Sequence, residues 1–191
     1  MNLSLSDRKV VYHLCIRKIS SLKEDYMDNI LFKQFINICR ALNNIDIKPT
    51  LMGSLGLELV SDREWSPSDI DIHVPGDPRG WEAPDEDRIY NFEQINAVMH
   101  QLGFSLIDRH EHEYSNGDIS IEFGCIDTLP EFADIQLPEL QEMHIDGTGF
   151  FVPTLKQYLK IYKASSKDSY RNDNNNFKDF EKIAYLDSRI N

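Results

Sequence analysis

Apolar residues recur along the chain with two different spacings, and each spacing predicts a different kind of element. Steps of three and four residues predict helices, and strict alternation of apolar and polar residues predicts strands. The predicted helices cover residues 6–22, 28–42, 54–60, 92–102, 154–164 and 177–186. The predicted strands cover residues 48–52, 69–74, 104–115 and 118–126.

Turn-forming residues and polar runs separate these elements. Asn116-Gly117 predicts a tight hairpin between the last two strands. Residues 61–68, 75–87 and 165–176 are polar or rich in proline, glycine and asparagine, and they are predicted to be loops. The order of helices, then mixed strands and helices, then helices again predicts an α+β domain. We expect an α+β core with N-terminal helices over residues 1–150 and a C-terminal helical region packed on it over residues 151–191.

Composition and charge narrow the possible functions. The net charge of -12 disfavours long DNA or RNA as a partner, because nonspecific affinity for nucleic acid comes mainly from Lys and Arg. No stretch of about 18 consecutive apolar residues occurs, so we expect no membrane span. The three cysteines lie far apart and the first residues do not resemble a secretory signal. These features predict a cytoplasmic protein with reduced thiols.

The alternating strand over residues 69–74 carries the clearest candidate chemistry. Residues two apart in a strand point to the same face, so Asp69 and Asp71 are predicted to project together. Two adjacent carboxylates repel each other unless a cation lies between them. Mg²⁺ takes oxygen ligands and commonly uses one or two carboxylates plus substrate phosphates. We therefore expect Asp69 and Asp71 to bind Mg²⁺.

Two further segments support a phosphate and metal site. Gly53-Ser54 lies where a predicted strand enters a predicted helix, and there backbone amides can approach a phosphate. On the predicted strand over residues 118–126, Glu122 stands on the polar side of alternating apolar residues. A third carboxylate there can complete a two-metal site or act as a base on an incoming hydroxyl.

Taken together, these residues resemble the nucleotidyltransferase superfamily related to DNA polymerase β, and within it the small bacterial and antibiotic nucleotidyltransferases. Gly53-Ser54 is similar to the family's glycine–serine turn, Asp69 and Asp71 to its metal pair, and Glu122 to its third acid. The resemblance extends from about residue 28 to residue 186. It implies a short mixed β-sheet flanked by helices, followed by a C-terminal helical region.

The resemblance also implies an activity and its partners. The expected reaction is Mg²⁺-dependent transfer of a nucleoside monophosphate from an NTP, ATP in the first instance, to a hydroxyl-bearing acceptor. Asp69, Asp71 and Glu122 would be the catalytic and metal-binding residues, and Gly53, Ser54 and Lys163 would bind the nucleotide. The alternative is a noncatalytic nucleotide-binding or protein-interaction module, such as one component of a toxin–antitoxin pair. The sequence leaves open the acceptor, the base preference and the oligomeric state.

Overall fold

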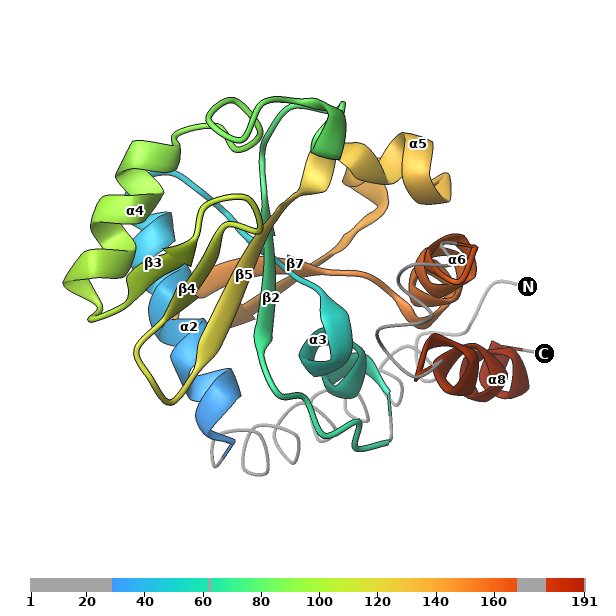
Figure 1. The fold of residues 1–191 in the computed structure, drawn as a ribbon. Coiled ribbons are helices and arrows are strands. Elements are labelled where there is room, and N and C mark those ends of the chain that lie inside the picture. Colours follow the sequence, from blue (N-terminus) through green and yellow to red (C-terminus); the bar gives the residue numbers. More distant parts are fainter. Residues whose placement is uncertain (1–28, 62, 168–177, 191) are drawn as a thin grey trace, which may run out of the picture.

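The computed structural model describes residues 29–61, 63–167 and 178–190 (Figure 1). The predicted helix over residues 6–22 and most of the predicted loop over residues 165–176 lie outside these ranges. The helices are α2 (Ile30–Asn43), α3 (Gly53–Val60), α4 (Phe92–Gln101), α5 (Leu129–Ala133), α6 (Leu155–Ser165) and α8 (Lys178–Ile190). Short 3-10 helices are η1 (Gly80–Glu82), η2 (Ile126–Thr128) and η3 (Leu137–Glu139). Among the described residues, no helix combines the length and apolar character needed to cross a bilayer.

The described strands form one mixed sheet in the order β3-β4-β5-β2-β1-β7-β6. The strands are β1 (Thr50–Leu51), β2 (Ile70–Val74), β3 (Ser105–Asp108), β4 (Glu113–Ser115), β5 (Ser120–Cys125), β6 (Gln141–Ile145) and β7 (Thr148–Val152). β2 runs parallel to β5 and β1 runs parallel to β7. The other neighbouring pairs are antiparallel. The α+β prediction with a mixed sheet flanked by helices is confirmed.

Apolar positions divide the sheet into two faces. In β2, Ile70, Ile72 and Val74 are fully buried in a core that they share with α2 and α4. Ile121 and Phe123 of β5 enter the same core. Because side chains alternate along a strand, the polar residues between them face the opposite side of the sheet. α2 and α4 cover the apolar face, as Figure 1 shows.

A second core lies on the other side of the sheet, among α3, α5, α6 and α8. Leu57, Tyr158 and Leu186 are fully buried in it. α6 begins with a capping box, in which the Thr154 side chain accepts from the Gln157 backbone and the Gln157 side chain accepts from the Thr154 amide. These reciprocal bonds fix where α6 starts, and α8 then packs along α6. The site described below lies between the polar face of the sheet and these helices.

The structure corrects several predicted boundaries. The predicted strand over residues 104–115 is two strands, because the Asp108 carboxylate accepts from the amides of His110 and Glu111 and turns the chain. The predicted strand over residues 69–74 begins one residue later, at Ile70, so Asp69 precedes it. The sequence pattern does not predict β6, β7 or α5. β7 pairs with β1 and ends at Val152.

Candidate active site

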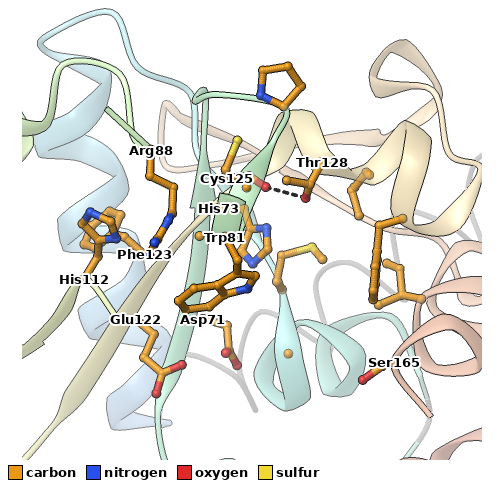
Figure 2. A pocket seen from close by; sticks show the side chains of 18 of the residues that line it. Asp71, His73, Trp81, Arg88, His112, Glu122, Phe123, Cys125, Thr128 and Ser165 are labelled. Carbon is orange, nitrogen blue, oxygen red and sulfur yellow. Dashed lines mark hydrogen bonds between the residues drawn. The ribbon is translucent and has the colours of Figure 1, made fainter. Parts of the chain in front are cut away.

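Asp71 and Glu122 stand side by side on the polar face of the sheet. Asp71 lies in the middle of β2 and Glu122 lies in β5, and the two residues are direct partners in the parallel register. Their strand neighbours are buried in the apolar core, so the two carboxylates project to the other side. Figure 2 shows both side chains on the same side of their strands, at the cavity. The structure thus brings together two of the three predicted acids, from positions far apart in the sequence.

Gly53 leaves room for the Asp71 side chain at the beginning of α3. It is the first residue of α3 and has a φ of +58°, which glycine adopts without strain. A Cβ atom at this position would lie 1.6 Å from Oδ2 of Asp71. The amide of Met52 also donates to the carbonyl of Asp71 at 2.9 Å. The glycine therefore permits a contact between the Asp71 carboxylate and the helix N-terminus that any other residue would prevent.

Negative charge accumulates around Glu122. Burial, followed by the nearby charges of Asp71, Asp69 and Glu113, raises the pKa of Glu122 to about 7. Asp69 is half-buried immediately before β2 and does not line the cavity. A divalent cation between the Asp71 and Glu122 carboxylates would offset the repulsion that raises this pKa.

The donor set fits Mg²⁺ better than a metal held entirely by protein. Among the described residues, no group of three or more His, Cys, Asp and Glu side chains is arranged to hold a metal ion. Mg²⁺ does not need such a group, since it keeps several waters and is commonly bound by one or two carboxylates together with substrate phosphates. Asp71 and Glu122 supply hard oxygen ligands of that kind.

A lysine from the C-terminal helix reaches the glycine–serine turn. Nζ of Lys182, in α8, donates to Oγ of Ser54 at 2.9 Å and lies 4.7 Å from the centroid of the Tyr162 ring. The side chain of Lys182 is buried, although lysine is seldom buried without a partner. This places a positive charge beside the turn expected to hold phosphates.

The sequence pattern does not indicate Lys182, and the resemblance points to Lys163 instead. Lys163 is half-exposed in α6, pairs with Asp187 at 3.0 Å and does not line the cavity. The only signal for Lys182 was its place three residues after Asp179, which puts both on one face of a helix. Asp179 is fully buried and accepts a 2.7 Å hydrogen bond from Ser165 of α6. That bond fixes α8 against α6 and so sets the position of Lys182.

A cavity of about 670 Å³ opens over Asp71, Glu122 and Gly53. Its floor includes Gly53, Asp71 and Glu122, and one wall comes from Tyr158 and Tyr162 of α6. The opposite wall comes from the loop after β2 and the turn between β3 and β4. Its volume lies in the range of about 300–1,000 Å³ typical of small-molecule sites.

We compared the sequence with family models and with known proteins. No family model matches it. The chain is 36% identical over 164 residues to the uncharacterized protein YnaI of Bacillus subtilis (strain 168), a match that covers 84% of this chain and 97% of YnaI.

Solved structures give the fold. An antigenic nucleotidyltransferase-like protein from Paracoccidioides brasiliensis superposes with a TM-score of 0.53 at 15% identity, over 83% of this chain and 76% of that one. ANT(2")-Ia in complex with adenylyl-2"-tobramycin matches with a TM-score of 0.46 at 13% identity, over 83% and 98% of the two chains. The match to the Paracoccidioides protein shows that the chain has a nucleotidyltransferase-like fold, and the 36% identity to YnaI shows that it belongs to the same family as that Bacillus subtilis protein.

Proposed function

We propose that this protein is a Mg²⁺-dependent nucleotidyltransferase that moves a nucleoside monophosphate from an NTP to a hydroxyl-bearing acceptor. The observation that carries the proposal is the pairing of Asp71 with Glu122 in the strand register, directly against the N-terminus of α3 at Gly53. Such an arrangement suits phosphoryl transfer, because catalysis of that reaction consists mostly of positioning the reactants and neutralising phosphate charge.

The proposed roles follow from where each side chain lies. Asp71 and Glu122 would hold Mg²⁺, which neutralises phosphate charge when bound, and Asp69 is a further candidate ligand beside them. The amides at Gly53 and Ser54 would contact the β- and γ-phosphates at the positive end of α3. Lys182 replaces Lys163 in the proposal, since its ammonium group lies at Ser54. Glu122 would either complete a second metal site or accept the proton of the acceptor hydroxyl.

The proposed step balances without any further reactant. The acceptor oxygen forms a bond to the α-phosphorus of the NTP, and the bond from that phosphorus to the bridging oxygen of the β-phosphate breaks. Pyrophosphate leaves with the electron pair of the broken bond, and the hydroxyl proton passes to a carboxylate or to solvent. The residues of this chain orient the two oxygens roughly in line and hold the triphosphate charge.

Calorimetric titration of MgATP and MgGTP into the wild type and Asp71→Asn tests the proposal. We expect at least one nucleotide to bind the wild type only when Mg²⁺ is present, and Asp71→Asn to lose that binding by about tenfold or more, because a charge-assisted ligand contributes roughly 1.5–3 kcal/mol. Asp46→Asn, an exposed aspartate outside the cavity, is the matched control and should bind as the wild type does. Equal nucleotide binding by wild type and Asp71→Asn would contradict the proposal.

A further inference from the structure

The glycine–serine turn joins a strand to a helix, and the C-terminal helices pack against it. β1 ends at Leu51, Met52 follows, and α3 begins at Gly53. α6 packs against α3, and α8 packs along α6. Figure 1 shows α3, α6 and α8 on the same side of the sheet. If the turn holds phosphates as proposed above, contacts that fix its backbone also fix the phosphate site.

Tyr158 of α6 holds the backbone immediately before the turn. Its side chain is fully buried, and its hydroxyl donates to the carbonyl of Leu51 at 3.2 Å. A buried tyrosine hydroxyl and a buried backbone carbonyl each need a hydrogen-bond partner, and this bond serves both groups. Burial, followed by the nearby Tyr162 and Asp71, raises the pKa of Tyr158. The hydroxyl therefore keeps its proton and remains a donor at neutral pH.

Gly56 leaves room for this hydroxyl in the first turn of α3. A Cβ atom at Gly56 would lie 2.1 Å from the hydroxyl oxygen of Tyr158 and 2.8 Å from the carbonyl oxygen of Leu51. Any larger residue would displace the tyrosine or the end of the strand. The amide of Gly56 donates to the carbonyl of Met52 at 3.0 Å, which closes the first turn of the helix. Tyr158 thus contacts both the end of β1 and the start of α3.

A second contact holds the turn from the other side. The Tyr158 ring stacks on the Tyr162 ring, with centroids 5.9 Å apart and an angle of 19° between the ring planes. Nζ of Lys182 lies 4.7 Å from the centroid of the Tyr162 ring and donates to Oγ of Ser54. The two tyrosines and the lysine form one series of contacts from Leu51, before the turn, to Ser54 within it.

From these contacts we propose that Tyr158 is a positioning residue for the phosphates of the nucleotide, because its hydrogen bond to Leu51 fixes the direction of the amides in the glycine–serine turn. This inference rests on the function proposed above. Amides that are already oriented lose less freedom when a phosphate binds to them. The β- and γ-phosphates of ATP depend on this orientation, whereas AMP lacks both groups.

The substitution Tyr158→Phe tests this role, because it keeps the stacked ring and removes only the hydrogen bond. We expect the affinity for MgATP to fall by about threefold to tenfold relative to that for AMP, as the loss of one neutral hydrogen bond would give. Tyr185→Phe, at a partly buried tyrosine of α8 outside the cavity lining, is the matched control and should keep the wild-type ratio. Calorimetry measures both affinities. An unchanged ratio in Tyr158→Phe would overturn the assignment, whatever happens to its melting temperature.

A variant at Gly56 separates the hydrogen bond from packing. Gly56→Ala keeps Tyr158 but puts a methyl group where its hydroxyl lies, so both the melting temperature and the ratio of MgATP to AMP affinity should fall. The double variant Gly56→Ala/Tyr158→Phe removes the shortest of the new contacts and should recover part of the melting temperature. The affinity ratio should stay low, because the hydrogen bond to Leu51 is still missing. Recovery of both quantities together would show that packing alone matters and would overturn the positioning role.

Amide hydrogen exchange without nucleotide tests the same contact independently of the proposed function. The amide of Met52 donates to the carbonyl of Asp71 at 2.9 Å, and the amide of Gly56 donates to that of Met52. In Tyr158→Phe both amides should exchange about threefold to tenfold faster, while the amide of Ser61, at the far end of α3, keeps its wild-type rate. Equal acceleration at all three amides, or at none, would overturn a specific effect on the turn. Failure of MgATP to bind the wild type would overturn the proposed function instead, and the exchange rates would still decide whether Tyr158 holds the turn.

Discussion

At the scale of single residues, Gly53 combines a left-handed backbone with a side-chain position that is already filled. Its φ is +58° and the space a Cβ would need is filled by the Asp71 carboxylate. Gly147 also has a positive φ, +79°, but nothing lies within 4 Å of a Cβ built there. Substitutions at Gly147 therefore measure backbone strain alone, whereas substitutions at Gly53 add a clash with the Asp71 carboxylate.

We expect Gly53→Ala to lose both stability and MgATP binding, and Gly147→Ala to lose stability alone. An alanine with left-handed backbone costs about 1–2 kcal/mol, and this applies at both positions. At Gly53 the added methyl must also displace Asp71. Thermal unfolding and calorimetry measure the two effects. Nucleotide binding that survives Gly53→Ala would mean that the contact between Gly53 and Asp71 is not needed for the site.

At the scale of elements, α8 brings Lys182 to the N-terminal turn of α3. Ser54 and Lys182 are 128 residues apart in sequence, and their hydrogen bond joins the first turn of α3 to α8. The buried bond from Ser165 to Asp179 fixes α8 against α6 one helical turn before Lys182. A phosphate bound at Ser54 would meet a lysine whose position is already set.

Substitution of Lys182 and of Lys163 tests which of the two lysines binds the phosphates. Lys182→Met should weaken MgATP binding by about tenfold or more relative to AMP, because a hydrogen bond to a charged group contributes roughly 1.5–3 kcal/mol. Lys182→Arg should restore part of the affinity by keeping the charge. Lys163→Met should leave the ratio of ATP to AMP affinity unchanged, because Lys163 lies outside the cavity. A loss of ATP preference in Lys163→Met but not in Lys182→Met would show that Lys163 is the phosphate-binding lysine.

At the scale of the whole molecule, the cavity lies between the sheet and the helices of its polar side. Its two walls come from segments before and after β5, and its floor comes from β2, β5 and α3. A buried ionisable group on one of these walls links pH to the stability of the fold. His112 is such a group, since burial, with a further contribution from Arg88, lowers its pKa.

The contribution of His112 to stability should therefore fall below pH 6.5, whereas the raised pKa of Glu122 acts in the opposite sense over the same range. A histidine whose pKa is lowered by folding binds its proton in the unfolded chain first. Its contribution is complete above the unfolded pKa of about 6.5 and is lost as the pH falls toward the folded pKa. His112→Asn, which tolerates the residue's φ of +49°, should raise the free energy of unfolding at pH 5 relative to that at pH 7, compared with the wild type.

Chemical denaturation at the two pH values measures this change. His100→Asn, an exposed histidine in α4, is the control and should keep the wild-type dependence. An unchanged dependence in His112→Asn would show that this histidine is not linked to folding.

Local patterns determined much of this protein by themselves. Alternation in residues 70–74 and 120–125 fixes which side chains enter the apolar core, because a strand turns successive side chains to opposite faces. That rule placed Asp71 and Glu122 on polar faces before their strands were known to be neighbours. The hairpin at Asn116-Gly117 likewise depends on a few adjacent residues, and β4 and β5 pair across it.

Tertiary structure alone decided the contacts between distant segments. The register that sets Asp71 beside Glu122, the burial that raises the pKa of Glu122 and the hydrogen bond from Lys182 to Ser54 all join segments far apart in the chain. Side-chain periodicity carries no information about which strand becomes a neighbour or which lysine meets the glycine–serine turn. Those choices follow from the packing of whole elements, where the free energy of burying the two cores selects one arrangement.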